Sequence, residues 1–435
     1  AFMSNGFYKN RRLKSFLFLA VCLLVSTIPH IFQFKHFLFF TITISFLVAC
    51  YGLNVISKNI KRSVFSQSNE KIISDDKLPA LDILVAARDE ENVIERLVER
   101  LFNLDYPINK LNIYIIDDGS SDKTPLILER LSKEFDKLKI ITRSANAGGG
   151  KSGALNYALK FTHGEWLLIL DADAQLKNDT LPRLFRFVYE GSWSAVQLRK
   201  SVINVSKNFL TTCQSMEMAM DAIFQYGRLS VAGVSELRGN GQLINKEVLL
   251  KCGSFNEDTV TDDLDLSLRL LLSKSKIGIL WDPPVMEEAV ENISALFSQR
   301  QRWAEGGLQR FFDYGEQLFS KKIELIQKFD LTFFFILQYA LPIISLIDLI
   351  LSIALTESPS YWPISITAFT LSGIAVWYGS SCKSEGPVLQ NLNLMMMLVS
   401  LVYLSHWFLV IPWVTIKMSI FPKKILWKKT LHTGV

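Results

Sequence analysis

Long apolar segments at both ends of this 435-residue chain constrain its fold more than any other feature. Two lie near the N-terminus, at 15–32 and 36–56, and three lie towards the C-terminus, at 331–355, 361–378 and 392–414. Each approaches the roughly 20 residues that an α-helix needs to cross a bilayer. The basic residues before the first segment are also typical of a signal peptide, but a second apolar segment follows almost at once, which favours a helical hairpin. We therefore expect a membrane protein with an N-terminal transmembrane hairpin and about three C-terminal apolar segments.

Charged residues collect between these ends, where the sequence is typical of a globular α/β domain. Apolar strand-like runs alternate with helix-like segments there, which favours a mainly parallel sheet. The predicted organisation is a transmembrane hairpin at 1–57, a polar linker at 58–78, an α/β domain at 79–293, amphipathic interface helices at 294–330, a C-terminal transmembrane region at 331–416 and a basic tail at 417–435.

The distribution of basic residues predicts which side of the membrane the domain occupies. Lys and Arg flank the N-terminal hairpin on both sides, so the positive-inside rule places the α/β domain in the cytoplasm. The lysines of the tail, from Lys417 onward, also favour the cytoplasm, yet three further crossings would leave them outside. Either one C-terminal segment is re-entrant or interfacial, or Pro342 splits the first of the three into two short helices. The net charge of +5, clustered beside apolar helices, fits an anionic membrane surface better than nucleic acid.

The stretch "ANAGGGKS", residues 145–152, is one residue from the phosphate-binding signature G-x-x-x-x-G-K-[ST], with Ala145 in place of the first glycine. A nucleoside triphosphatase is therefore one interpretation. Its neighbours argue against it, because "DDGS" precedes it with two carboxylates that would repel a triphosphate. The glycines and Lys151 still favour close approach to phosphate, and a solvent-facing helix start is the alternative for this lysine.

Two acidic motifs follow. In "LILDAD", Asp171 and Asp173 are two residues apart at a strand end, so both side chains can project to one side, as ligands of a divalent cation on a diphosphate. An acidic turn is the structural alternative. In "TVTDDLDL", Asp262 and Asp263 follow Thr261, a good helix N-cap residue, and anions are stabilised at that end of a helix. These carboxylates are candidate proton acceptors, or merely part of a well-capped helix.

Two further motifs complete the set. "QRQRW" places Gln299 and Arg302 on one side of a helix beside Trp303, a patch suited to phosphate and sugar, or to an amphipathic helix at the membrane surface. In "ELRGNGQL", the glycines permit close backbone approach to a sugar, with Arg238 or Asn240 as polar contacts, although a plain turn explains them equally well.

The ordered set "DDGS", "DAD", "TDD" and Q-x-x-R-W resembles the family 2 glycosyltransferases, whose catalytic domain has the GT-A fold. From about Leu81 the chain is similar in more detail to the cyanobacterial monoglucosyldiacylglycerol synthases. This resemblance implies inverting transfer of glucose from UDP-glucose to the free hydroxyl of 1,2-diacylglycerol, with a divalent cation, Mg²⁺ or Mn²⁺. It also implies a domain on the cytoplasmic face of a plasma or thylakoid membrane.

The resemblance also implies roles for particular residues. The uridine would be held by Ala87, Arg88, Glu90 and Asp118. The diphosphate would face Asp171 and Asp173, with Asp173 as metal ligand, and the general base would be Asp263. The diphosphate would also be bound, and the acceptor site walled, by Gln299, Arg302 and Trp303. Asp262 stands where many relatives have Glu, and Arg88 where many have an aromatic residue.

The chemistry of the residues agrees with an inverting transferase. A glycerol hydroxyl is a poor nucleophile, so a positioned carboxylate must take its proton, and a single base with direct displacement inverts the anomeric centre. A processive polysaccharide synthase is the alternative enzyme, since Q-x-x-R-W also marks that class, although few helices here would line a polymer channel. A non-catalytic membrane scaffold or transporter is disfavoured by the presence of every expected carboxylate.

Overall fold

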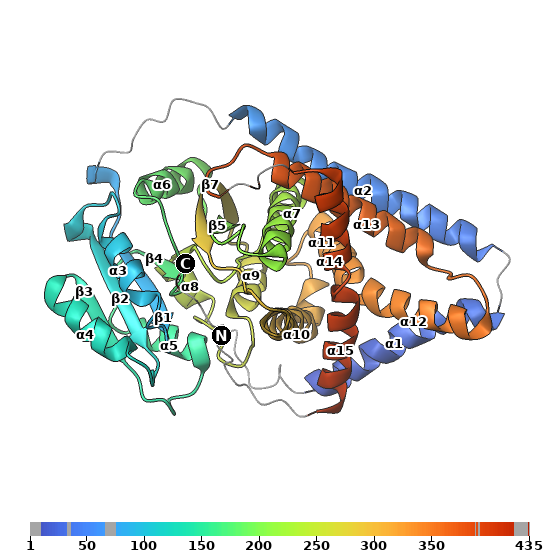
Figure 1. Cartoon of the computed structure of the whole chain (residues 1–435), viewed down its shortest axis with the longest axis horizontal. Coiled ribbons are helices and arrows are strands. Elements are labelled where there is room, and N and C mark those ends of the chain that lie inside the picture. Colours follow the sequence, from blue (N-terminus) through green and yellow to red (C-terminus); the bar gives the residue numbers. More distant parts are fainter. Residues whose placement is uncertain are drawn as a thin grey trace.

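A computed structural model describes residues 10–32, 36–65, 75–387, 389, 392–421 and 434, with the side chains of 60–65 excepted. An α/β domain occupies one half of the molecule and long helices occupy the other (Figure 1). Part of the predicted linker, at 66–74, and most of the basic tail, at 422–433, lie outside the described residues.

A seven-stranded sheet forms the centre of the domain, in the order β3-β2-β1-β4-β6-β5-β7. β1 pairs in parallel with β2 and β4, and β5 with β7, whereas β6 is antiparallel to both of its neighbours. The predicted mainly parallel sheet is therefore confirmed. Its strands are β1 (Leu81–Ala87), β2 (Leu111–Asp117), β3 (Leu138–Thr142), β4 (Trp166–Leu170), β5 (Ala195–Val202), β6 (Gln242–Asn245) and β7 (Ile277–Glu287).

Helices cover both faces of the sheet, which explains why its central strands are apolar without alternation. One core, which includes Ile83 and Leu168, packs against α3, where Ile94, Leu97 and Leu101 face inward at helical spacing. The other core contains Leu84 and residues of α5 and α9. The helices and short 3₁₀ turns of the domain are η1 (Asp75–Lys77), α3 (Ile94–Phe102), η2 (Ile108–Lys110), α4 (Thr124–Glu134), α5 (Gly150–Ala158), α6 (Thr180–Gly191), α7 (Phe209–Ala232), α8 (Lys246–Lys251), α9 (Asp262–Leu272) and α10 (Ile293–Leu318).

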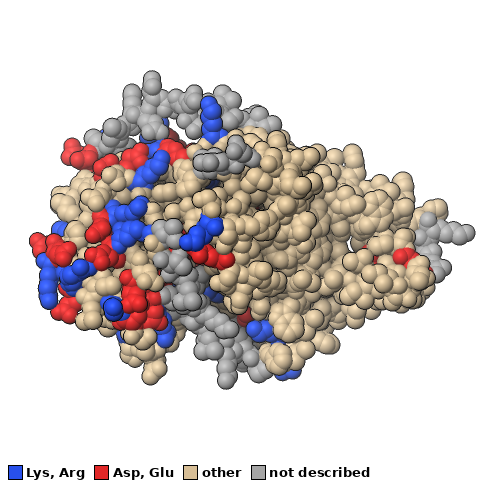
Figure 2. Space-filling view, in the orientation of Figure 1, with Lys and Arg blue, Asp and Glu red and all other residues tan. Residues whose placement is uncertain are grey.

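The apolar segments form α1 (Arg11–Phe32), α2 (Phe37–Phe65), α11 (Leu325–Phe335), the π-helical turn η3 (Ile336–Ala340), α12 (Leu341–Leu355), α13 (Trp362–Ser381), α14 (Leu394–Leu404) and α15 (Trp407–Ile420). Four helical stretches within the described residues are long and apolar enough to cross a membrane: 11–32, 37–59, 325–355 and 394–420. Charged side chains cover the α/β half of the visible face, and the helical half is almost free of them (Figure 2). The protein is therefore membrane-associated.

The expectation that Pro342 splits its segment into two helices is one of the two alternatives stated above, and it is wrong. Residues 325–355 form one continuous helical stretch. Proline cannot donate a backbone hydrogen bond and clashes with the preceding turn. Here the π-helical turn at 336–340 directly precedes Leu341 and Pro342, and this wider turn accommodates the proline without breaking the helix.

Two long helices, α7 and α10, join the domain to the apolar helices. α7 packs along α2 and α13, and α10 packs along α9 on one side and α15 on the other. Buried ion pairs fix these junctions, for example Arg228 with Asp330 at 2.7 Å and Arg11 with Asp313 at 2.5 Å.

Candidate active site

The carboxyl ends of β1 and β2 form a corner that contains all four predicted uridine-binding residues. The Asp118 N–H donates to the carbonyl of Ala87 at 2.9 Å, and the Asp118 carboxylate pairs with Arg143 at 2.9 Å. Burial raises the pKa of Asp118, and the charges of Arg143 and Arg88 oppose that rise. Glu90 is buried in the same turn. The register of β1 and β2, which pairs Ala87 with Asp117, brings these residues together.

The glycine-rich stretch forms a turn that leads into α5. Gly148, Gly149 and Gly150 all have positive φ, which glycine adopts at little cost. Lys151 then reaches across the sheet edge, 2.5 Å from Asp171 Oδ1 and 3.1 Å from the carbonyl oxygen of Gly239. Burial alone would lower the pKa of Lys151, but Asp171, Asp262 and Asp263 together raise it, so the lysine is a fixed cation. The lysine of this P-loop-like sequence therefore pairs with a carboxylate at the end of β4.

Asp173 lies deeper than Asp171 in the same turn after β4. It is buried, and its Oδ2 accepts a 2.8 Å hydrogen bond from the Glu288 N–H just after β7. Glu288 in turn pairs with Arg96 at 3.1 Å. This arrangement fixes the second carboxylate of "DAD" between the ends of two strands.

The "TDD" motif occupies the start of α9. Thr261 holds the N-cap position, but its side chain makes no capping hydrogen bond. Asp263 Oδ1 accepts from the Leu264 N–H at 2.9 Å. Burial raises the pKa of Asp262 to about 6, against the nearby Lys151, and burial also raises the pKa of Asp263. The start of a helix was expected to stabilise these two anions. Desolvation has the larger effect here, so the pKa values of both carboxylates are raised.

The "QRQRW" motif lies on α10, which faces these carboxylates. Burial lowers the pKa of Arg302, while the charges of Asp171, Asp263 and Asp262 act to raise it, which places the guanidinium within reach of both acidic motifs. The Trp303 ring centroid lies 5.9 Å from Lys200 Nζ on β5. Gln299 lies one turn earlier and accepts a hydrogen bond from Arg300. Arg302 therefore borders one site together with Lys151 and the acidic pair, whereas the contact of Gln299 is to Arg300 on its own helix.

Arg238 and Asn240, the predicted polar contacts of the "ELRGNGQL" motif, are held by the protein itself. Arg238 forms ion pairs with Asp221 and Glu236, both at 2.8 Å. Asn240 is fully buried: its Oδ1 accepts from the Asp171 N–H at 3.1 Å and its Nδ2 donates to Glu287 at 3.1 Å. Gly239 lies close to the "TDD" motif, since a Cβ built there would lie 3.2 Å from Asp263 Oδ2.

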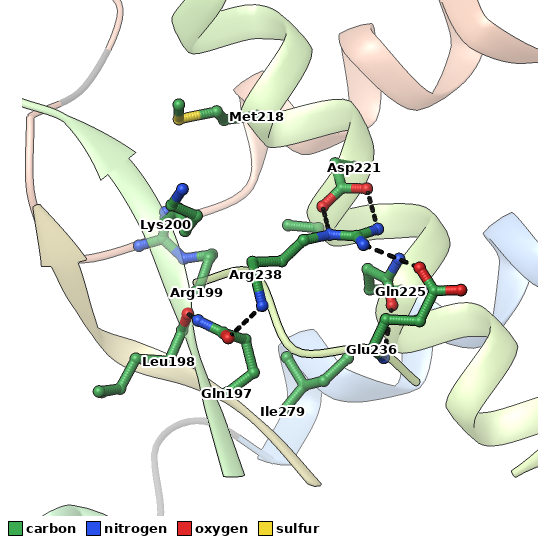
Figure 3. Close-up of a pocket in the computed structure, with 11 residues that line it drawn as sticks. Gln197, Leu198, Arg199, Lys200, Met218, Asp221, Gln225, Glu236, Arg238 and Ile279 are labelled. Carbon is green, nitrogen blue, oxygen red and sulfur yellow. Dashed lines mark hydrogen bonds and ion pairs between the residues drawn. The ribbon is translucent and has the colours of Figure 1, made fainter. Parts of the chain in front are cut away.

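A small pocket adjoins Arg238, between β5 and α7 (Figure 3). Its polar lining includes Gln197, Arg199, Lys200, Asp221 and Glu236. Two of the cations that line it, Arg238 and Lys200, act to lower the pKa of Asp263, against the effect of burial.

Sequence reasoning missed four residues that bound the site: Arg143, Lys200, Glu287 and Glu288. Lys200 pairs with Glu287 at 2.9 Å, beside Trp303. The acidic pair at the end of "DPPVMEE" was a usable signal, since it ends a buried strand as the other motifs do. Arg143 and Lys200 carried no local signal, because their partners lie 25 and 87 positions away in the chain.

The acidic strand ends fit a divalent cation only in part. Within the described residues, no three His, Cys, Asp or Glu side chains gather as a metal-binding group. Mg²⁺ commonly takes one or two carboxylates and completes its shell with substrate phosphates and water. Asp171 and Asp173 meet that smaller requirement.

The fold and these motifs together define a class of protein. Residues 82–251 match the family model described as Glycosyl transferase family 2, and the chain belongs to this family. It is 41% identical over 361 residues to the beta-monoglucosyldiacylglycerol synthase of Trichormus variabilis, a match that covers 82% of this chain and 77% of the relative. It is 40% identical over 359 residues to the enzyme of that name from Synechocystis, covering 81% and 75% respectively.

A solved structure agrees on the fold. The mannosyltransferase PcManGT from Pyrobaculum calidifontis, in complex with GDP-Man and Mn²⁺, superimposes with a TM-score of 0.57 at 18% identity and covers 84% of this chain and 99% of its own. The predicted GT-A type of sheet domain, flanked by apolar helices, is confirmed. The P-loop nucleoside triphosphatase interpretation is wrong, since the glycine-rich loop belongs to a glycosyltransferase domain.

Proposed function

We propose that this protein transfers glucose from UDP-glucose to the free hydroxyl of 1,2-diacylglycerol, with inversion, and releases UDP and β-monoglucosyldiacylglycerol. The observation that carries the proposal is the 41% identity to a synthase of that name across 77% of the synthase. The cations near Asp263, namely Lys151 and Arg302, support the proposal, because they can stabilise a leaving diphosphate.

In the proposed mechanism, Asp263 accepts the proton of the acceptor hydroxyl as its oxygen attacks the anomeric carbon. The bond from that carbon to the UDP oxygen breaks, and the electron pair leaves with UDP. Asp263 suits this role because burial raises its pKa, which makes the carboxylate a better base than an exposed one. One displacement by one base inverts the anomeric centre.

The leaving diphosphate gains negative charge, which fixed cations stabilise without reorganisation. Arg302 and Lys151 lie on opposite elements, α10 and α5, and both act electrostatically on Asp171 and the "TDD" pair. Asp171 and Asp173 would hold a divalent cation, which would supply further neutralisation of the diphosphate. The corner formed by Ala87, Arg88, Glu90 and Asp118 would hold the uridine.

A lipid acceptor explains why the domain adjoins apolar helices. We propose that the domain lies on the cytoplasmic face, where UDP-sugars are available, and that the basic flanks of the hairpin favour anionic lipids. The processive polysaccharide synthase is the less favoured alternative, because the relatives with 40–41% identity carry the glycolipid name.

The test is a donor-by-acceptor assay with the full chain in lipid nanodiscs. UDP-glucose and diacylglycerol should give one product, with a β-anomeric linkage by NMR. Omission of diacylglycerol should leave no transfer product. Polymer formation without the lipid, or an α-linked product, would refute the proposal. EDTA should abolish transfer, and added Mg²⁺ or Mn²⁺ should restore it.

A further inference from the structure

Arg300 lies inside the "QRQRW" motif but outside the Q-x-x-R-W pattern. It is fully buried, whereas Gln299, Arg302 and Trp303 are partly exposed towards the site. Its Nη1 donates to Gln299 Oε1, and its guanidinium carbon lies 4.1 Å from the Trp303 ring centroid. One rigid planar group therefore contacts both residues that would wall the acceptor site.

The guanidinium is held from the other side by Glu217 on α7. Arg300 Nη2 lies 2.5 Å from Glu217 Oε2, and both side chains are buried. Glu217 also accepts hydrogen bonds from Tyr403 OH on α14 at 2.8 Å and from Trp407 Nε1 on α15 at 2.9 Å. Arg300 donates to Tyr403 OH as well, at 3.1 Å. A single carboxylate thus joins α7 and α10 to the two last apolar helices.

We propose that Arg300 is a positioning residue for glycosyl transfer. Held by Glu217, it fixes Gln299 and Trp303 in the orientation that receives the acceptor. Because Tyr403 and Trp407 share Glu217, that orientation depends on how α14 and α15 sit against α10. The inference rests on the proposed function, since it concerns the acceptor side of the same site.

The substitution Arg300→Lys keeps the positive charge of the side chain but removes its planar shape. A lysine retains a positive partner for Glu217, so the buried carboxylate is not left alone. It lacks the planar fork that contacts Gln299 and stacks on Trp303 at the same time. Arg300→Lys therefore tests orientation rather than charge.

The experiment measures kinetics for the two substrates separately in Arg300→Lys, with protein quantified as folded enzyme in nanodiscs. We expect kcat/KM for diacylglycerol to fall about 10- to 100-fold, the scale of a slightly misplaced reactant. The dissociation constant for UDP should change little. A general loss of stability would not lower kcat/KM for diacylglycerol while leaving the dissociation constant for UDP unchanged.

The matched control is Arg228→Lys. Arg228 is also buried, pairs with Asp330 at 2.7 Å, and lies 4.3 Å from the Phe334 ring centroid. Within the described residues it forms no hydrogen bond or ion pair with the "QRQRW" motif. It should keep the acceptor kinetics of the wild type. A second variant, Trp407→Phe, removes one donor to Glu217 while Arg300 stays, and should raise the KM for diacylglycerol.

Wild-type acceptor kinetics in Arg300→Lys would overturn the inference. If that variant does not fold, an unchanged acceptor KM in Trp407→Phe overturns it instead. If the wild type itself transfers no glucose to diacylglycerol, the proposed function fails and this inference falls with it. Transfer by the wild type together with unaltered variants refutes the inference alone.

Discussion

At the scale of single residues, the proposed mechanism depends most on Asp263, its general base. The change Asp263→Asn keeps the shape of the side chain but removes the proton acceptor. We expect transfer to fall by roughly 10²- to 10⁴-fold, the usual contribution of a general base. UDP binding, measured by calorimetry, should persist, because the uridine corner lies at the ends of β1 and β2. Turnover near the wild-type rate would disprove the assignment of the base.

Asp262 tunes that base through its charge. The pKa of Asp262 is raised to about 6, and the pKa of Asp263 is raised as well, because loss of solvent around these two neighbouring carboxylates disfavours their charged forms. The proton acceptor must be ionised, so kcat/KM should fall at acid pH, and it should do so at a higher pH than an exposed aspartate would give, because the pKa of Asp263 is raised. Asp262→Asn removes the like charge that disfavours ionisation of Asp263, and should shift this acid limb to lower pH. A pH–rate profile of the two proteins checks this, and an unchanged limb would count against coupling of the pair.

At the scale of elements, the contact between α9 and α10 sets the distance from the proposed base to the residues proposed to bind the diphosphate. Gly306 on α10 permits it, since a Cβ at this position would lie 2.6 Å from the Thr261 Cβ, directly before Asp262. We expect Gly306→Ala to destabilise the fold by about 1–3 kcal/mol through overpacking and to lower activity. Gly315→Ala is the control on the same helix, because nothing lies within 4 Å of its added Cβ. Thermal unfolding and transfer assays compare them, and equal behaviour of both variants would contradict this role of Gly306.

The sequence predicted elements better than the contacts between them. Strand ends with acidic or glycine-rich motifs were recognisable locally, because parallel strands bring their carboxyl ends to one edge. The raised pKa of Asp262 was not, because burial by other elements outweighs the local helix start. Glu217 gave no signal either, since it contacts Arg300 across 83 positions of sequence. Local patterns thus located the site, but its desolvation and its support depend on tertiary packing.

At the scale of the whole molecule, contacts define which helices run away from the domain. α1 begins beside the domain at Asp313 and reaches a distal end, where His30 pairs with Asp348 of α12 at 2.8 Å. α2 and α13 also meet at this distal end, where the ring centroids of Phe37 and Tyr361 lie 5.4 Å apart. α13 then returns to α7, since a Cβ on Gly379 would lie 2.6 Å from the Ala219 carbonyl oxygen. α13 is not among the helices whose composition marks them as candidate spans. Its close packing against α7 explains how it can still extend from the distal end to the domain.

The stretch α14–α15 behaves differently, although its composition is apolar enough for a span. At its start, Leu392 packs with Cys213 and Val290 of the domain side, and at its end Ser419 accepts from Arg12 at 3.0 Å. Both ends therefore lie near the domain, and in Figure 1 the stretch runs across the direction of α1 and α12. This geometry favours an interfacial or re-entrant segment. With α1, α2, α11–α12 and α13 as the crossings, Lys417 in the last turn of α15 lies on the side of the domain, as the positive-inside rule requires.

Single cysteines in a cysteine-free background test this topology with a membrane-impermeant maleimide on oriented vesicles. We expect Asn393→Cys and Phe421→Cys to react from the same side as Lys133→Cys on α4 of the domain. Ser358→Cys, in the connection between α12 and α13, should react only from the opposite side. All four positions are exposed, so accessibility reports the side of the membrane rather than burial. If Asn393→Cys instead reacts together with Ser358→Cys, α14–α15 crosses the bilayer and the interfacial placement is wrong.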